Sequence, residues 1–90
     1  MGPSRRPRHA AEVRFRQFDN EILLLRPESG TGIWLNETAS LVWLLCNGER
    51  TIAEIIELLR EAFPVAAENL PAEVEDTLRV LSGHGAIEVE

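Results

Sequence analysis

Apolar residues recur with a period of two before residue 36 and with a helical period after it. Residues 13–16 (VRFR) alternate between apolar side chains and arginine, which is typical of a half-buried strand. Asp19 and Asn20 supply turn chemistry, so 21–26 (EILLLR) is the expected returning strand of a hairpin. After the turn-forming segment 27–32 (PESGTG), residues 32–35 (GIWL) predict a third strand. The first part of the chain therefore predicts a three-stranded antiparallel sheet.

Asn36 follows the third strand directly and has the side chain of a favoured helix N-cap. Four apolar residues then recur at i, i+3, i+4 and i+7, namely Ala39, Val42, Trp43 and Cys46. This spacing predicts a helix near 37–46, and Gly48 is the expected left-handed residue that ends it.

Two further helices are expected near 52–63 and 71–83. Thr51 and Glu54 have the spacing of a capping box, and Pro64 ends the second helix. The expected core combines strand and helix residues: Ile33 or Leu35, Val42, Ile55, Ile56, Leu59, Val74, Leu78 and Leu81. The last residues, 86–90 (AIEVE), alternate weakly and are either a short strand or a frayed end.

Three strands followed by three helices predict a winged-helix-like α+β domain. Ninety residues with 44% hydrophobic content are enough for one core and one domain. Residues 1–11 contain Pro3 and Pro7 and have no periodicity, so we expect a disordered basic tail there and the folded domain over 12–90.

Charge is distributed unevenly along the chain. Residues 1–16 have a net charge of +4, whereas residues 17–90 have a net charge of −10. In a DNA-binding winged helix the last helix would read the major groove, but here that helix has three early carboxylates, Glu73, Glu75 and Asp76, against Arg79. We therefore do not expect nucleic-acid binding.

Reactive side chains are few. Cys46 is the only cysteine and lies on the predicted apolar face of its helix, so a buried structural role is expected. His9, Cys46 and His84 do not have metal-ligand spacing, and no phosphate-binding loop or catalytic triad pattern occurs. The N-terminus has no apolar signal region, and no apolar run could span a membrane. We expect a cytoplasmic, non-catalytic protein without metal or cofactor.

The third strand lies at an edge if the three strands form a meander, and it has none of the usual protection against pairing. Between Gly32 and Asn36 there is no lysine, proline or charged residue. The edge is therefore either covered by the protein's own helices or open to a partner strand. Trp34 faces away from Ile33 and Leu35, so an exposed Trp34 would be a binding anchor.

The ordered residues taken together resemble the PqqD family and, more widely, the RiPP recognition elements, which act on ribosomally synthesised, modified peptides. The resemblance extends from about Val13 to Ile87. It rests on LLRPE at 24–28, LN at 35–36 followed by Ala39, LCNG at 45–48, RTIAEI at 50–55, EV at 73–74, and Leu78, Leu81 and Gly85. The chain departs from the family at Asn47, where aspartate is usual, and at Thr77, where an aromatic is common.

This resemblance implies a non-catalytic chaperone that binds the leader of a precursor peptide, as in pyrroloquinoline quinone biosynthesis or a related pathway. The leader would add as a strand in a groove between the third strand and the last helix, and be presented to a modifying enzyme, often of the radical SAM class. The expected peptide-binding residues are Gly32, Ile33, Trp34, Leu35, Glu73, Asp76, Thr77 and Val80. The alternative is a structural domain that uses the same edge to form a homodimer.

Overall fold

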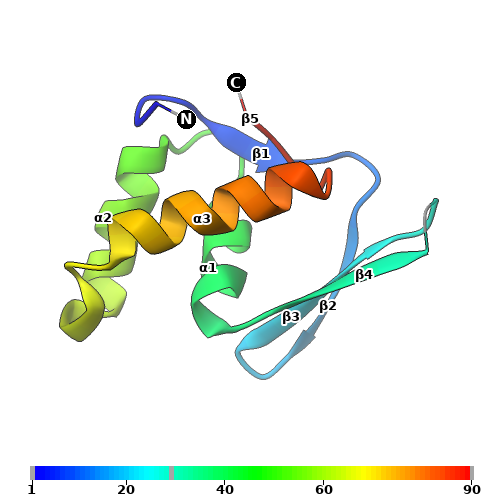
Figure 1. Ribbon diagram of the computed structural model, residues 1–90, viewed down its shortest axis with the longest axis horizontal. Helices are drawn as coiled ribbons and strands as arrows, with labels where there is room; N and C mark the ends of the chain where they lie inside the picture. The colour runs from blue at the N-terminus through cyan, green and yellow to red at the C-terminus, as the bar shows by residue number, and fades with distance from the viewer. Residues whose placement is uncertain (1, 29, 90) are drawn as a thin grey trace.

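The computed structural model describes residues 2–28 and 30–89 and has an α+β fold (Figure 1). An antiparallel sheet has the order β2 (Arg14–Phe18), β3 (Glu21–Arg26), β4 (Thr31–Leu35). The helices that follow are α1 (Glu37–Leu45), α2 (Ile52–Ala62) and α3 (Leu70–Gly83), with a 3-10 turn η1 (Pro64–Ala66) before α3. A separate strand pair joins β1 (Pro7–His9) to β5 (Ile87–Val89). The predicted fold class is confirmed, and the arrangement is compatible with a winged-helix-like domain.

The helix starts are fixed by the expected capping side chains. The Ala39 N–H donates to Asn36 Oδ1 over 2.9 Å at the start of α1. At the start of α2 the Glu54 N–H donates to Thr51 Oγ1 over 3.2 Å, and the Thr51 N–H donates to Glu54 Oε1 over 2.9 Å. The bond from the Thr51 backbone lowers the pKa of the Glu54 carboxyl. Both capping predictions are confirmed.

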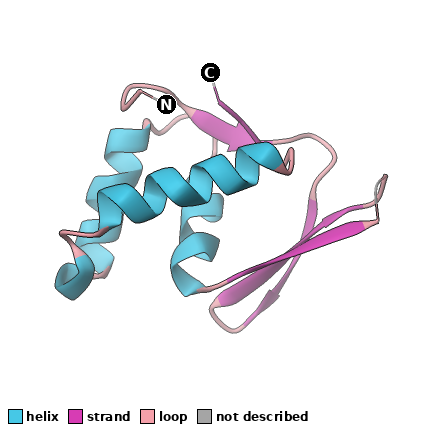
Figure 2. Ribbon diagram, in the orientation of Figure 1, coloured by secondary structure: helices cyan, strands magenta, loops and turns pink. Residues whose placement is uncertain are grey.

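The core lies between the inner face of the sheet and the three helices, which occupy the other side of the molecule in Figure 2. Ile22 and Leu24 of β3 are 0% and 1% exposed, and they pack in one cluster with Val42 and Trp43 of α1 and with its cap residue Cys46. Of the predicted core, Leu35, Val42, Ile55, Leu59, Val74, Leu78 and Leu81 are buried, while Ile33 and Ile56 are partly buried and pack against the cluster. Burial of these side chains is the main stabilising contribution to the fold.

The N-terminal segment differs from the expected disordered tail. Pro7–His9 forms β1, pairs antiparallel with β5, and places Pro7 in a buried position. The His9 ring stacks on Trp43 with centroids 3.7 Å apart and planes 6° apart, and His9 Nε2 donates to the Trp43 carbonyl. The pairing also shows that Ile87–Val89 form a strand rather than a frayed end. No local periodicity predicts it, because β1 and β5 meet only through long-range contacts.

Three smaller expectations also differ. Strand β2 is exposed along its length rather than half-buried, since it lies at one edge of the sheet. Helix α1 ends with the cap residue Cys46, so Gly48 is not its left-handed cap, although Gly48 has a φ of 82° and donates its N–H to the Pro7 carbonyl over 2.9 Å. The connection between α2 and α3, for which the sequence predicts no helix, contains η1. Met1, Ser29 and Glu90, which belong to the predicted tail, second turn and terminal segment, lie outside the described residues.

Candidate functional site

Strand β4 is the edge strand from which the candidate site is built. It pairs only with β3 in the described sheet, with Ile33 opposite Leu24 and Leu35 opposite Ile22. The two-residue turn between Phe18 and Glu21 closes on a hydrogen-bonded pair, and backbone groups in an antiparallel strand alternate in direction. Counting from that pair, Gly32 and Trp34 direct their N–H and C=O groups away from β3. These groups are available to another strand.

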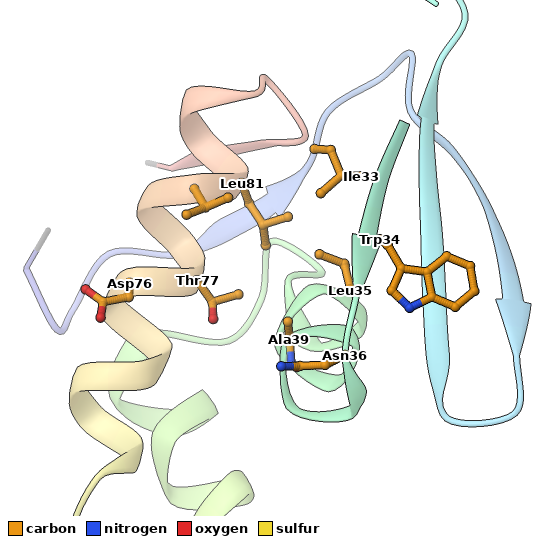
Figure 3. Close-up of a pocket in the computed structure, with 9 residues that line it drawn as sticks. Ile33, Trp34, Leu35, Asn36, Ala39, Asp76, Thr77 and Leu81 are labelled. Atoms are coloured by element: carbon orange, nitrogen blue, oxygen red, sulfur yellow. The ribbon is translucent and has the colours of Figure 1, made fainter. Parts of the chain in front are cut away.

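A groove of about 260 Å³ lies between this edge and helix α3. Its centre is apolar, because Ile33 and Leu35 of β4 face Val80 and Leu81 of α3, with Ala39 of α1 at its base. Figure 3 shows that the labelled Ile33, Leu35, Thr77 and Leu81 lie on the facing sides of the strand and the helix. Val80 is 51% exposed, so this wall of the groove is accessible from solvent. Such a surface accepts apolar side chains from a ligand that reaches the strand edge.

The groove continues into a more polar section near the start of α1. This section is lined by Asn36, Thr38, Glu73, Asp76 and Thr77 and has a volume of about 350 Å³. The Asp76 carboxylate is paired with Arg79 over 2.9 Å, and both side chains are mostly exposed, at 73% and 70%. This ion pair offsets part of the negative charge that the sequence predicts for the section. Glu73, the other carboxylate of the section, has no ion pair with the described residues.

The predicted site residues lie together around the groove, except that Gly32 and the Trp34 side chain face the other side of the sheet. Ile33, Trp34, Leu35, Asp76, Thr77 and Val80 line the apolar section, and Glu73 lines the polar section. Gly32 belongs to the same strand, but a side chain at this position would contact Leu23 and Leu25. The position therefore faces the other side of the sheet. The Trp34 ring also points to that other side, as Figure 3 shows. Trp34 therefore contributes its backbone to the groove edge.

Sequence reasoning did not assign four lining residues to the groove: Asn36, Thr38, Ala39 and Leu81. The sequence predicts Asn36 as a helix cap, Ala39 on the apolar face of the first helix, and Leu81 in the core. A signal was nonetheless present, since Leu81 follows Thr77 by four residues and therefore lies on the same helix face. Ala39 and Thr77 are small, which leaves the space between α1 and α3 open.

The thiol of Cys46 lies outside the groove and is chemically protected. Cys46 is 0% exposed, and its Sγ–H donates to the Val42 carbonyl over 3.1 Å. Burial raises the pKa of this thiol to about 12, so it is protonated at neutral pH and is a poor nucleophile. Among residues 2–28 and 30–89, no three metal-ligating side chains come together, and none of the described helices is long and apolar enough to cross a membrane.

Comparisons with known proteins give one family match and two matching folds. The family model for coenzyme PQQ synthesis protein D (PqqD) matches residues 21–87. The structure of TbiB1 in complex with the TbiA(beta) leader peptide shares the fold with a TM-score of 0.79, at 23% identity over 90% of this chain and 94% of that chain. Lasso peptide synthetase B1 complexed with the leader peptide has a TM-score of 0.78, at 22% identity over 92% and 98% of the two chains. The search of curated proteins finds no match.

Proposed function

The chain belongs to the family of coenzyme PQQ synthesis protein D (PqqD), and from this premise we propose that it binds the leader segment of a ribosomally synthesised precursor peptide. The leader pairs as an added strand with β4 and lies in the groove between β4 and α3. The bound peptide is then presented to a separate enzyme that modifies it. The two solved structures of the same fold are described as complexes with leader peptides, which supports this proposal.

The observation that carries the proposal is the combination of an open strand edge with an adjoining apolar groove. The backbone groups of Gly32 and Trp34 offer a ladder to an incoming strand, and the groove beside them is lined by Ile33, Val80 and Leu81. In strand addition the main-chain hydrogen bonds supply affinity, while pockets under alternate side chains supply specificity. A leader with apolar residues at alternate positions fits this surface.

The polar section adds a charge preference. A basic leader residue near the start of α3 would meet Glu73 and the partly neutralised Asp76. Ordering a disordered leader offsets part of the interaction energy, so the expected dissociation constant is nanomolar to micromolar, or about 8 to 12 kcal/mol.

The role is non-catalytic in this proposal, and Cys46 supports it because the thiol is buried and protonated. The modifying enzyme that receives the peptide is expected to belong to the radical SAM class, which the family resemblance favours. We place the protein in the cytoplasm, where precursor and enzyme would meet it.

The proposal is tested by substituting Trp34, whose amide faces the open edge. Trp34→Pro removes that N–H and restricts φ, whereas Trp34→Ala removes the ring and keeps the amide. Each variant is titrated by calorimetry with a synthetic leader peptide of a candidate precursor, chosen from short reading frames near this gene. We expect Trp34→Pro to bind at least about tenfold more weakly, equivalent to the loss of one or two hydrogen bonds, and Trp34→Ala to bind within about threefold of wild type.

Glu57→Ala on the solvated face of α2 is the remote control, and circular dichroism establishes that all variants fold. If Trp34→Pro fails to fold, Val80→Arg replaces it, because a long charged side chain at Val80 fills the groove from α3. Leader binding at wild-type strength by folded Trp34→Pro or by Val80→Arg would refute strand addition in this groove. If wild type forms dimers without leader and these variants are monomeric, the edge serves homodimerisation instead.

A further inference from the structure

The outer face of the β2–β3–β4 sheet, on the side opposite the helices, has three rows of residues opposite one another. One row contains Arg16, Leu23 and Trp34, the next contains Arg14, Leu25 and Gly32, and the third contains Phe18 and Glu21. Because side chains alternate across a strand, these eight residues share one face. The proposed groove lies on the other side of β4, where Ile33 and Leu35 point. We call the eight residues the outer sheet face.

Two large aromatic side chains are fixed in exposed positions on this face. Phe18 is 48% exposed and Trp34 is 54% exposed. Their rings stack with centroids 5.5 Å apart and planes 26° apart, and the Trp34 Nε1–H donates to Glu21 Oε1 over 2.8 Å. These contacts hold the indole in one position before any partner arrives. Preorganised aromatic residues lose little side-chain entropy on binding and are frequent interface anchors.

The leucines beside this pair are kept accessible by a glycine. A side chain at Gly32 would contact Leu23 Cδ1 at 3.5 Å and Leu25 Cδ2 at 3.6 Å, so its absence leaves the two leucines partly exposed. Together with the aromatic pair they form an apolar centre on a sheet face that no helix of the described chain covers. Exposed contiguous apolar surface of this kind is typical of interaction sites.

Arginines border the apolar centre. Arg14 and Arg16 are exposed, and neither guanidinium has an ion pair or side-chain hydrogen bond with residues 2–28 or 30–89. The single carboxylate on the face, Glu21, already accepts from Trp34. The face is therefore apolar and basic, although residues 17–90 have a net charge of −10. Its complement is a protein surface with carboxylates around an apolar centre.

We propose that the outer sheet face is a second docking surface, distinct from the groove, and that it binds the modifying enzyme through an acidic surface patch of that enzyme. This inference rests on the proposed function for the choice of partner. An added leader strand would extend the same sheet at β4, so an enzyme seated on this face lies directly beside the peptide. The arrangement allows one domain to hold substrate and enzyme at the same time.

A second copy of this chain fits the face less well than an acidic partner. Two such faces brought together would place four arginines against two glutamates, each of which already accepts a hydrogen bond from its own tryptophan. Like charges opposed across an interface disfavour association. The acidic body of the protein also opposes nucleic acid as the occupant.

The test compares charge reversals on two sides of the molecule. The probe is a purified candidate modifying enzyme, chosen from reading frames near this gene, titrated by surface plasmon resonance without leader. Arg14→Glu/Arg16→Glu is expected to weaken binding at least tenfold, as is Phe18→Ala, which removes half of the aromatic pair. Arg50→Glu/Arg60→Glu changes one arginine before α2 and one in its last turn. It makes the same change in net charge and should bind within threefold of wild type.

Leader titration of the same variants separates this inference from the proposed function. The Arg14 and Arg16 substitutions are expected to leave the leader dissociation constant within threefold of wild type, whereas Val80→Arg abolishes leader binding and leaves enzyme binding intact. The docking proposal is overturned if the enzyme binds Arg14→Glu/Arg16→Glu and Arg50→Glu/Arg60→Glu equally well. It is also overturned if the enzyme does not bind wild type. Dimers in sedimentation velocity that Arg14→Glu/Arg16→Glu dissociates would assign the face to a second copy and overturn it as well. Failure of wild type to bind the leader would refute only the proposed function.

Discussion

Cys46 illustrates how burial of a single side chain determines its chemistry. The thiol is 0% exposed within the core cluster, and burial raises its pKa from 9.0 to about 12. The sequence contains no lysine or tyrosine, and all nine basic residues are arginine, so Cys46 is the only side chain that titrates between about pH 8 and pH 12. Its effect on stability can therefore be measured without interference from other side chains.

We expect the free energy of unfolding to fall as pH rises above 9. The unfolded thiol ionises near pH 9, whereas the folded thiol stays protonated up to about pH 12, so the unfolded state releases its proton first. The slope approaches about 1.4 kcal/mol per pH unit within this window. Urea denaturation at pH 7.5, 9, 10 and 11 measures it, and Cys46→Ala should show no such slope.

At pH 7.5, Cys46→Ala should be about 1 kcal/mol less stable than wild type, because it removes a small buried group, and its leader affinity should be unchanged. An equal alkaline slope in Cys46→Ala would show that the thiol is not the titrating group. Loss of peptide modification by a folded Cys46→Ala, in a reaction with precursor and enzyme, would instead require a chemical role for this residue.

At the level of secondary-structure elements, the N-terminal segment forms a strand and contacts other parts of the domain. Strand β1 pairs with β5, the Pro7 carbonyl accepts from Gly48 and the Arg5 carbonyl accepts from Ile52, each over 2.9 Å. The segment thus connects the C-terminal strand to the loop between α1 and α2. It also covers Trp43 through the stacked His9 ring. Residues 5–9, which the sequence assigns to a tail, are thus bound to the rest of the domain.

Deleting residues 1–11 should therefore lower the free energy of unfolding by about 2 to 4 kcal/mol. The estimate combines several backbone hydrogen bonds at about 1 kcal/mol each with about 1 kcal/mol for the aromatic contact. Urea denaturation followed by circular dichroism measures the change. His9→Ala alone should cost about 1 kcal/mol, and a shorter deletion of residues 1–4 should cost less than the full one. A full deletion with wild-type stability would favour the disordered tail.

Over the whole molecule, charge is separated between the two proposed binding surfaces. The polar section of the groove contains Glu73 and Asp76, while the outer sheet face contains Arg14 and Arg16. A basic leader would approach the first surface and an acidic enzyme patch the second. This separation reduces competition between the two partners, because each surface repels the partner of the other.

Leader affinity should consequently decrease with salt. Raising NaCl from about 50 mM to about 500 mM is expected to weaken binding about three- to tenfold, because screening acts on the exposed carboxylates near the groove. Fluorescence anisotropy of a labelled leader measures the effect. Glu73→Gln should flatten the salt dependence, whereas Glu57→Gln on α2 should leave it unchanged. Salt-independent binding would mean that backbone pairing and apolar contacts alone determine the affinity.

Elements whose signals are local can be predicted from the amino-acid sequence alone. Helix boundaries followed from side chains three or four residues apart, such as Asn36 with Ala39 and Thr51 with Glu54. The opposite orientation of Trp34 follows from strand alternation, and the unprotected edge follows from the absence of lysine, proline and charge between Gly32 and Asn36. The residues of the groove's two walls follow from the family resemblance. Short-range geometry is sufficient for such features, because the period of a helix or strand fixes which side chains share a face.

Features that join distant segments become visible only in the folded chain. The Arg8 guanidinium donates to the Glu88 carboxylate, 80 residues away in the sequence. The His9 ring stacks on Trp43, and the Phe18 ring stacks on Trp34 on the outer sheet face. Neither β1 nor β5 has more than three residues, so neither has a period that identifies it. Their pairing becomes favourable only when the core has brought the chain ends together and offset the entropy of closing so long a loop.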